Sequence, residues 1–235
     1  MKKLLVADKY KRSMANYNFL DIGGGFGLSV AHLRGIHKMK TVSIENEERH
    51  YDGSCLFFNS LVKKHVYKIP FIPIFADAYD ITCFGGAFIT YAFIRGSVPN
   101  LIEHIYKVYY KDVTCKYLTT SEKFNQDVLM EDKITLRDQM SGVISNGGGS
   151  FQIYFYSKNK STKSSSRVNK RRDDENDACI KIRTAFEFYD HFRNLPKKYK
   201  SVQRIDNKKG NIELRRSSRN LTNSISTIRK IEKYV

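Results

Sequence analysis

An acid and a series of glycines, residue types that can bind a ligand, lie at the end of a short apolar run near the start of the chain. Residues 19–22 are apolar except for Asp21, and Gly23, Gly25 and Gly27 follow at every second position. A strand that breaks into such a turn brings backbone N–H groups and a helix N-terminus close to a bound nucleotide. The spacing is D-x-G-x-G-x-G, not the G-x-G-x-x-G that closes over a dinucleotide pyrophosphate. The pattern therefore predicts a nucleotide-like ligand other than a dinucleotide.

Two further acids end predicted strands later in the chain. Glu45 ends an apolar, β-branched run 24 residues after Asp21. Asp77, followed by Ala78, ends the run 71–76. One such acid alone is more often a solvated strand end. Three acids in order favour a ligand site, because the carboxyl ends of parallel strands lie at one edge of a sheet.

Residues 19–27 resemble motif I of the class I S-adenosylmethionine (SAM)-dependent methyltransferases, and the two later acids match this class in order. The resemblance implies that the glycines let the backbone approach the methionine and ribose, while Asp21 anchors polar groups of the ligand. It also implies that Glu45 accepts the ribose hydroxyls and that Asp77 bonds the adenine amino group. The implied cofactor is SAM, and its expected binding residues are Asp21, Gly23, Gly25, Gly27, Glu45, Asp77 and Ala78.

Tyr91 and Phe93 are the candidate catalytic residues, since the acceptor pocket of this class is usually built around the end of the fourth strand. Methyltransferases that act on exocyclic amines of DNA bases carry a [D/N/S]-P-P-[Y/F/W] motif there. Residues 91–96 read Tyr-Ala-Phe-Ile-Arg-Gly instead, which disfavours that substrate class. Methyl transfer is an in-line displacement, so alignment of the acceptor supplies much of the rate.

A second, fainter resemblance covers residues 88–124 and points to the non-SET histone-lysine methyltransferases of the disruptor-of-telomeric-silencing type. Phe93 and Gly96 fall on the first Phe and the Gly of that family's N-N-F-x-F-G sequence. Residues 119–123 loosely match its Ser-Ser-Lys end, whereas residues 91–92 replace both family asparagines. This resemblance implies transfer to a lysine of chromatin.

The elements that must position these residues alternate between strand and helix up to about residue 158. The expected strands are 17–22, 40–45, 71–76, 86–93 and 113–119; helices are expected over 27–37, about 51–64 and from 99; a hairpin pairs 134–140 with 151–156. Such alternation predicts an α/β fold with helices on both faces of a mostly parallel sheet. Five parallel strands followed by an antiparallel hairpin form the Rossmann-like sheet of the class I methyltransferases.

The last third of the chain has a different composition. The whole chain carries a net charge of +17, with 20 Lys and Arg against 15 acids up to residue 159 and 21 against 9 thereafter. We therefore predict a methyltransferase domain over 1–158, a basic low-complexity linker over 159–178, and a basic, largely disordered tail over 179–235 with one or two short helices that need a partner to order.

The basic segments predict a polyanionic partner, either nucleosome, RNA or DNA. A solvating tail or a nuclear address is the alternative explanation. The expected nucleic-acid-binding residues are Arg167, Lys170, Arg171, Arg172, Lys197, Lys198, Arg215 and Arg216.

The cysteine pattern and the first residues of the chain indicate in which cellular compartment the protein is expected. The four cysteines are scattered without a C-x-x-C pair, so no metal site is expected. Free thiols fit a reducing compartment, and the first apolar run is too short for a signal peptide. An intracellular protein, nuclear or cytoplasmic and neither secreted nor membrane-bound, is predicted.

Three functions fit these patterns. The favoured hypothesis is a SAM-dependent methyltransferase that acts on a protein (histone) lysine in a nucleic-acid context. The first alternative is an RNA methyltransferase, for cap or internal positions, with Tyr91 and Phe93 stacking on a base. The second is a catalytically inactive methyltransferase fold that binds nucleic acid; the intact acids and glycines argue against it.

Overall fold

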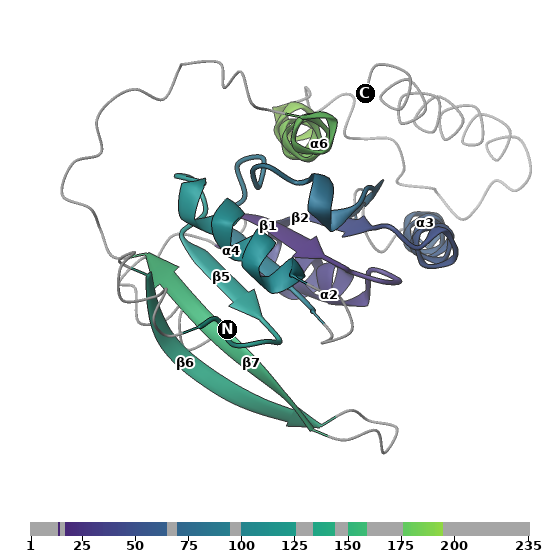
Figure 1. Ribbon diagram of the computed structural model, residues 1–235. Helices are drawn as coiled ribbons and strands as arrows, with labels where there is room; N and C mark the ends of the chain where they lie inside the picture. Colours follow the sequence, from purple (N-terminus) through teal and green to yellow (C-terminus); the bar gives the residue numbers. More distant parts are fainter. Residues whose placement is uncertain are drawn as a thin grey trace, which may run out of the picture. The chain divides into compact units, whose positions relative to one another are not determined.

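A seven-stranded sheet forms the centre of the computed structural model, which describes residues 14, 17–64, 70–94, 100–125, 134–143, 150–158 and 176–194 (Figure 1). The strand order is β3-β2-β1-β4-β5-β7-β6. The parallel strands are β1 (Asn18–Ile22), β2 (Lys40–Glu45), β3 (Ile72–Phe75), β4 (Ile89–Ala92) and β5 (Tyr117–Thr120). The antiparallel hairpin consists of β6 (Ile134–Val143) and β7 (Ser150–Lys158), with β7 next to β5. This is the predicted class I methyltransferase sheet.

The strand order reverses beside β1, and this places the three acids. β1 pairs with β2 on one side and with β4 on the other, so the connections on the two sides diverge. In open parallel sheets, ligands bind at the carboxyl ends of the strands at such a switch point. Asp21 lies there, with Tyr91 as its register partner on β4.

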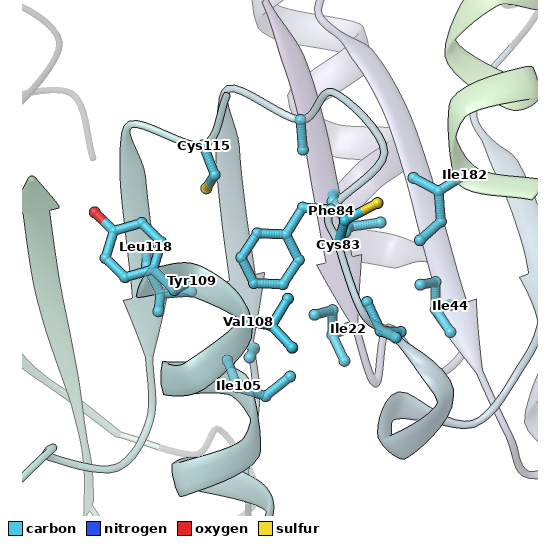
Figure 2. Packing of buried hydrophobic residues seen from close by; sticks show 14 of the residues in the cluster. Ile22, Ile44, Cys83, Phe84, Ile105, Val108, Tyr109, Cys115, Leu118 and Ile182 are labelled. Atoms are coloured by element: carbon cyan, nitrogen blue, oxygen red, sulfur yellow. The ribbon is translucent and has the colours of Figure 1, made fainter. Parts of the chain in front are cut away.

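Helices cover both faces of the sheet. On one face, α2 (Leu28–His37) and α3 (Glu48–Lys63) pack around Phe19, Phe71 and Ile89. On the other face lie α4 (Leu101–Lys111) and α6 (Asp177–Asn194). Figure 2 shows the second cluster, where Phe84 points between α4 and the strands and Ile182 reaches from α6 towards Ile44. The central strands are buried on both faces, which explains their nearly continuous apolar sequences.

Helix α6 corrects our prediction that the fold is complete at about residue 158. Its apolar side chains are buried in the same cluster as α4, with Ile182 at 0% exposure and Phe186 at 3%. The helix predicted near residues 179–195 therefore exists, but its partner is the sheet of its own chain. The first compact unit runs to Tyr189, and the second, Asp190–Val235, contains described residues only at the end of α6.

The connection between β3 and β4 explains why α6 has this role. A parallel crossover usually contains an α-helix that covers the sheet. Here residues 76–88 contain only a 3₁₀ turn, η2 (Ala78–Asp80). Without α6, apolar residues on this face of β1 and β2, such as Ile44, would lack a cover.

Two strands begin later than predicted. β4 starts at Ile89 instead of residue 86, because Gly86 has a φ of +90° and belongs to a turn. β5 starts at Tyr117 instead of residue 113, because the Asp112 carboxylate accepts the N–H groups of Thr114 and Cys115 at 2.8 and 3.1 Å and holds them in a loop. Both shifts come from turn geometry.

None of the described helices combines the length and apolar character needed to cross a bilayer. Within the described ranges, no three His, Cys, Asp or Glu side chains gather in a way that would hold a metal ion.

Candidate active site

The glycine turn after β1 leaves open space above its backbone. Gly23 and Gly24 donate their N–H groups to the carbonyl of Ile44 at 3.0 and 3.1 Å, which fastens the turn to β2. Gly25 has a φ of +54°, and a Cβ built there would meet nothing within 4 Å. Gly27 is closed in by contrast, since a Cβ there would lie 2.5 Å from the ring of Phe71. Space for a ligand therefore lies over Gly25.

The Glu45 carboxylate lies at the end of β2, beside this turn, and is held by three N–H groups. Oε2 accepts from the Gly25 N–H at 2.9 Å. Oε1 accepts from the N–H groups of Asn46 and Glu47, each at 3.0 Å. Charged hydrogen bonds of this kind fix a carboxylate before any ligand arrives. Oε2, which accepts only one of these bonds, keeps a further lone pair for a hydroxyl donor.

Asp21 is the most unusual group at the site. It is 1% exposed, and its Oδ2 accepts from the hydroxyl of Ser29 in the first turn of α2. Oδ1 is buried and has no hydrogen-bond partner among the described residues. Burial raises the pKa of the carboxyl from 3.8 to about 6, the Ser29 bond lowers it, and the Glu45 carboxylate raises it. A buried acceptor without a donor is costly, so Oδ1 is suited to a cationic or N–H donor from a ligand.

Asp77 has a local structural role and also faces a cavity. Its Oδ1 accepts the N–H of Tyr79 at 2.9 Å, which caps the η2 turn that Ala78 begins. Its Oδ2 lies 3.5 Å from the amide nitrogen of Asn46. The cavity, of about 470 Å³, is lined by Asn46, Phe75, Ala76, Asp77, Asp80, Asn176, Asp177, Ala178 and Lys181.

Tyr91 and Phe93 line a second cavity, together with residues of the glycine turn. Its volume is about 250 Å³, and its walls are Asp21, Gly23, Gly24, Phe26, Leu28, Ser29, Tyr91 and Phe93. The two ring centroids are 6.5 Å apart with a tilt of 41°. Burial, and secondly the Asp21 carboxylate, raise the pKa of Tyr91 to about 12, so its hydroxyl stays protonated at neutral pH.

The tertiary structure thus brings most of the predicted site residues to one edge of the sheet. Asp21, Gly23, Tyr91 and Phe93 share one cavity, and Asp77 faces the other. Glu45 is hydrogen-bonded both to Gly25 of the glycine turn and to Asn46, which lines the larger cavity. All eight basic residues predicted to bind nucleic acid lie outside the described residues: Arg167, Lys170, Arg171, Arg172, Lys197, Lys198, Arg215 and Arg216.

Several residues at the site were missed from the sequence. Ser29 and Asn46 come within two residues of predicted motifs, but nothing in their spacing marks them as partners of Asp21 and Asp77. Asn176 had a usable signal, since Asn is a preferred N-cap residue and the apolar pattern of a helix follows it. No signal in the sequence could have placed Asn176 on the wall of the larger cavity, because this position depends on how α6 packs.

In the block compared with histone-lysine methyltransferases, residues 88–124, the segments after β4 and β5 are hydrogen-bonded to each other. Ser121 accepts the N–H of Ile94 at 2.7 Å and donates to the carbonyl of Ile94, so the residues after β5 hold those after β4. Phe93 lines the smaller cavity, and Gly96 lies outside the described residues.

No protein-family model matches the sequence, and no curated protein matches it. Solved structures do match. Magnesium protoporphyrin IX methyltransferase (ChlM) from Synechocystis PCC 6803, solved with bound SAM, has a TM-score of 0.50 and 11% identity over 67% of this chain and 76% of that chain. This similarity confirms the class I methyltransferase fold.

Two RNA-modifying enzymes are also among the matching structures. The Bacillus subtilis M1A22 tRNA methyltransferase TrmK has a TM-score of 0.48 and 15% identity over 67% of this chain, and the match covers 66% of TrmK. An RNA methyltransferase from Salinibacter ruber, in complex with S-adenosyl-L-homocysteine, has a TM-score of 0.44 and 10% identity over 70% of this chain and 92% of that chain.

Proposed function

We propose that this protein is a SAM-dependent methyltransferase whose acceptor is a base in RNA. One observation carries the cofactor assignment: Asp21, whose buried Oδ1 has no hydrogen-bond partner among the described residues, lines a cavity together with Gly23 and Gly24 of the glycine turn. A ligand with a cationic donor next to a nucleoside would satisfy the carboxylate and fill that space. SAM has both features.

The residues present fit SAM. Asp21 Oδ1 would accept from the methionine ammonium, and the Glu45 carboxylate, already held by three N–H groups, would accept the ribose hydroxyls. Asp77 and Asn46, on the larger cavity, would bind the adenine edge. When bound, SAM supplies the methyl group. This chain's residues orient the cofactor, hold the acceptor in line and exclude water from the smaller cavity.

The acceptor assignment rests on the smaller cavity and on charge. Among its lining residues, Phe26, Leu28, Tyr91 and Phe93 present apolar or aromatic surface, and Asp21 is the carboxylate. Aromatic side chains stack on unpaired RNA bases. With a net charge of +17, the chain favours a polyanion over a neutral small molecule. The charge fits RNA and nucleosomes equally, so the aromatic cavity is the feature that supports the RNA alternative over the histone-lysine hypothesis.

Methyl-label transfer from SAM to a mixed panel of RNA, DNA, free histones and nucleosomes tests the acceptor. We expect label in RNA. Label confined to histone in nucleosomes would overturn the RNA assignment in favour of the lysine hypothesis. Absence of transfer to every member of the panel would contradict a macromolecular acceptor.

Replacing either ring of the smaller cavity should impair transfer but not cofactor binding. Tyr91→Ala and Phe93→Ala each remove a stacking surface worth about 1–3 kcal/mol, so RNA methylation should fall roughly 10-fold or more while SAM affinity stays within about 2-fold. Tyr91→Phe keeps the ring and should retain most activity. Tyr110→Ala is the matched control, because Tyr110 is 51% exposed on α4. Activity of Tyr91→Ala equal to that of Tyr110→Ala would rule out stacking.

Neutralising Glu45 should weaken SAM binding. Glu45→Gln removes a charged acceptor for the ribose hydroxyls, worth about 1.5–3 kcal/mol, so the Kd measured by calorimetry should rise about 10- to 100-fold. The amide oxygen can accept from the N–H groups of Asn46 and Glu47, but the amide nitrogen then faces the Gly25 N–H, so the melting temperature should fall and the Kd is measured well below it. Glu103→Gln, at an exposed position on α4, is the control. An unchanged Kd in Glu45→Gln would contradict the assignment of Glu45 as the acceptor of the ribose hydroxyls.

A further inference from the structure

We propose that helix α6 forms one wall of the cofactor site, so that docking of α6 and binding of SAM are thermodynamically coupled. This inference rests on the proposed function and adds an element that lies outside the motifs on β1, β2 and β3. The start of α6 comes from 96 residues further along the chain than the connection it contacts.

Polar bonds fasten the start of α6 to the connection after β3. The side-chain amide of Asn176 donates to the carbonyl of Asp80, and its oxygen accepts the N–H of Cys179 at 3.2 Å, which caps the helix. The sulfur of Cys179 in turn accepts the N–H of Cys83 at 3.0 Å. The position of the η2 turn, which carries Asp77 at its start, is therefore tied to the position of α6.

The larger cavity lies between these two segments. Asn46 and Asp77 line it from the ends of β2 and β3, and Asp80 lines it from the η2 turn. On the opposite wall are Asn176, just before α6, and Asp177 and Lys181 in its first turns. Lys181 and Asp177 form an ion pair of 2.8 Å on that wall. A ligand that contacts both walls binds better when α6 is docked, and by linkage it stabilises the docked helix by the same factor.

Two neighbouring glycines allow a matched test of docking. A Cβ at Gly85 would lie 2.6 Å from Ile182 and 2.8 Å from the backbone nitrogen of Arg183, so α6 would have to shift. A Cβ at Gly86 would meet nothing within 4 Å, and both glycines have positive φ angles, +57° and +90°. Gly85→Ala and Gly86→Ala thus share backbone strain, but only the first displaces α6.

We expect Gly85→Ala to weaken SAM binding by about 10-fold relative to Gly86→Ala, measured by calorimetry. In the wild-type chain, saturating SAM should slow hydrogen exchange of amides 177–189 by a similar factor. Equal SAM affinity of the two glycine variants, with α6 protection lost in Gly85→Ala, would overturn the coupling and leave the proposed function intact. Failure of the wild-type protein to bind SAM would overturn both.

A second pair of variants leaves the core untouched. Asp177→Ala alters the cavity wall at an exposed side chain, whereas Glu187→Ala alters a second described i,i+4 ion pair of α6, with Arg183, about 15 Å along the helix. Asp177→Ala should change SAM affinity by about 5-fold. Glu187→Ala should leave it within about 2-fold. Identical affinities in these two variants would also overturn the proposal.

Discussion

A chain that ends at residue 158 is expected to lose its cooperative unfolding transition. The truncation removes Ile182, Phe186 and Tyr189, which are 0%, 3% and 5% exposed in the core, and it uncovers the apolar face of β1 and β2 beneath them. Each large buried side chain contributes about 1.5–3 kcal/mol, so the loss reaches roughly 5–9 kcal/mol. The whole stability of a domain is only about 5–15 kcal/mol.

The comparison chain for this experiment ends at residue 195 and retains α6. Thermal melts by far- and near-ultraviolet circular dichroism should show a cooperative transition for residues 1–195 and none for residues 1–158. Dye binding should reveal exposed apolar surface only in the shorter chain. A cooperative melt of residues 1–158 at the same temperature would mean that α6 is dispensable, as the sequence-based boundary implied.

Substitution of Asp21 should move stability and binding in opposite directions. Ionised Asp21 is buried, and the difference between a pKa of 3.8 and about 6 corresponds to about 3 kcal/mol. Because the folded-state pKa is raised, the carboxyl destabilises the fold above pH 6 and has no such effect below pH 4. Asp21→Asn should therefore raise the stability of the ligand-free protein at pH 7.

The same variant should bind SAM more weakly. Loss of a charged bond to the ligand ammonium is expected to raise the Kd about 10- to 100-fold. In the wild-type protein, SAM affinity should increase from pH 5 to pH 7 as Asp21 ionises, and this increase should be absent in Asp21→Asn. Tyr91, the neighbouring phenol, stays protonated throughout this range.

Calorimetric titrations at pH 5, 6 and 7, with melts of the ligand-free protein at each pH, measure both effects. Ser29→Ala is a useful companion, since it removes the hydroxyl on Oδ2 and leaves Oδ1 unchanged. An Asp21→Asn protein that is less stable at pH 7 and binds SAM as tightly as the wild type would refute the role assigned to this carboxylate.

Local patterns determined the sheet and the positions of its acids. Each of the strands β1, β2 and β3 is a short apolar run with an acid at or within two residues of its end: Asp21, Glu45 and Asp77. Parallel strands place such ends at one edge of the sheet. The hairpin of β6 and β7 was predictable for a similar reason, since its two runs flank a glycine-rich turn sequence. Periodicity and turn chemistry act within a few residues, so the sequence contains them directly.

Only the tertiary structure decided what covers the sheet and what each acid contacts. The apolar face of α6 predicts that something must bury it, but no local pattern says that the partner is the connection after β3, 96 residues away. Likewise, Asp21 is marked by its motif, whereas its Ser29 partner and its unpartnered Oδ1 follow from packing of α2 against β1. Burial and hydrogen bonding between distant segments depend on the whole chain at once, because each segment is the environment of the others.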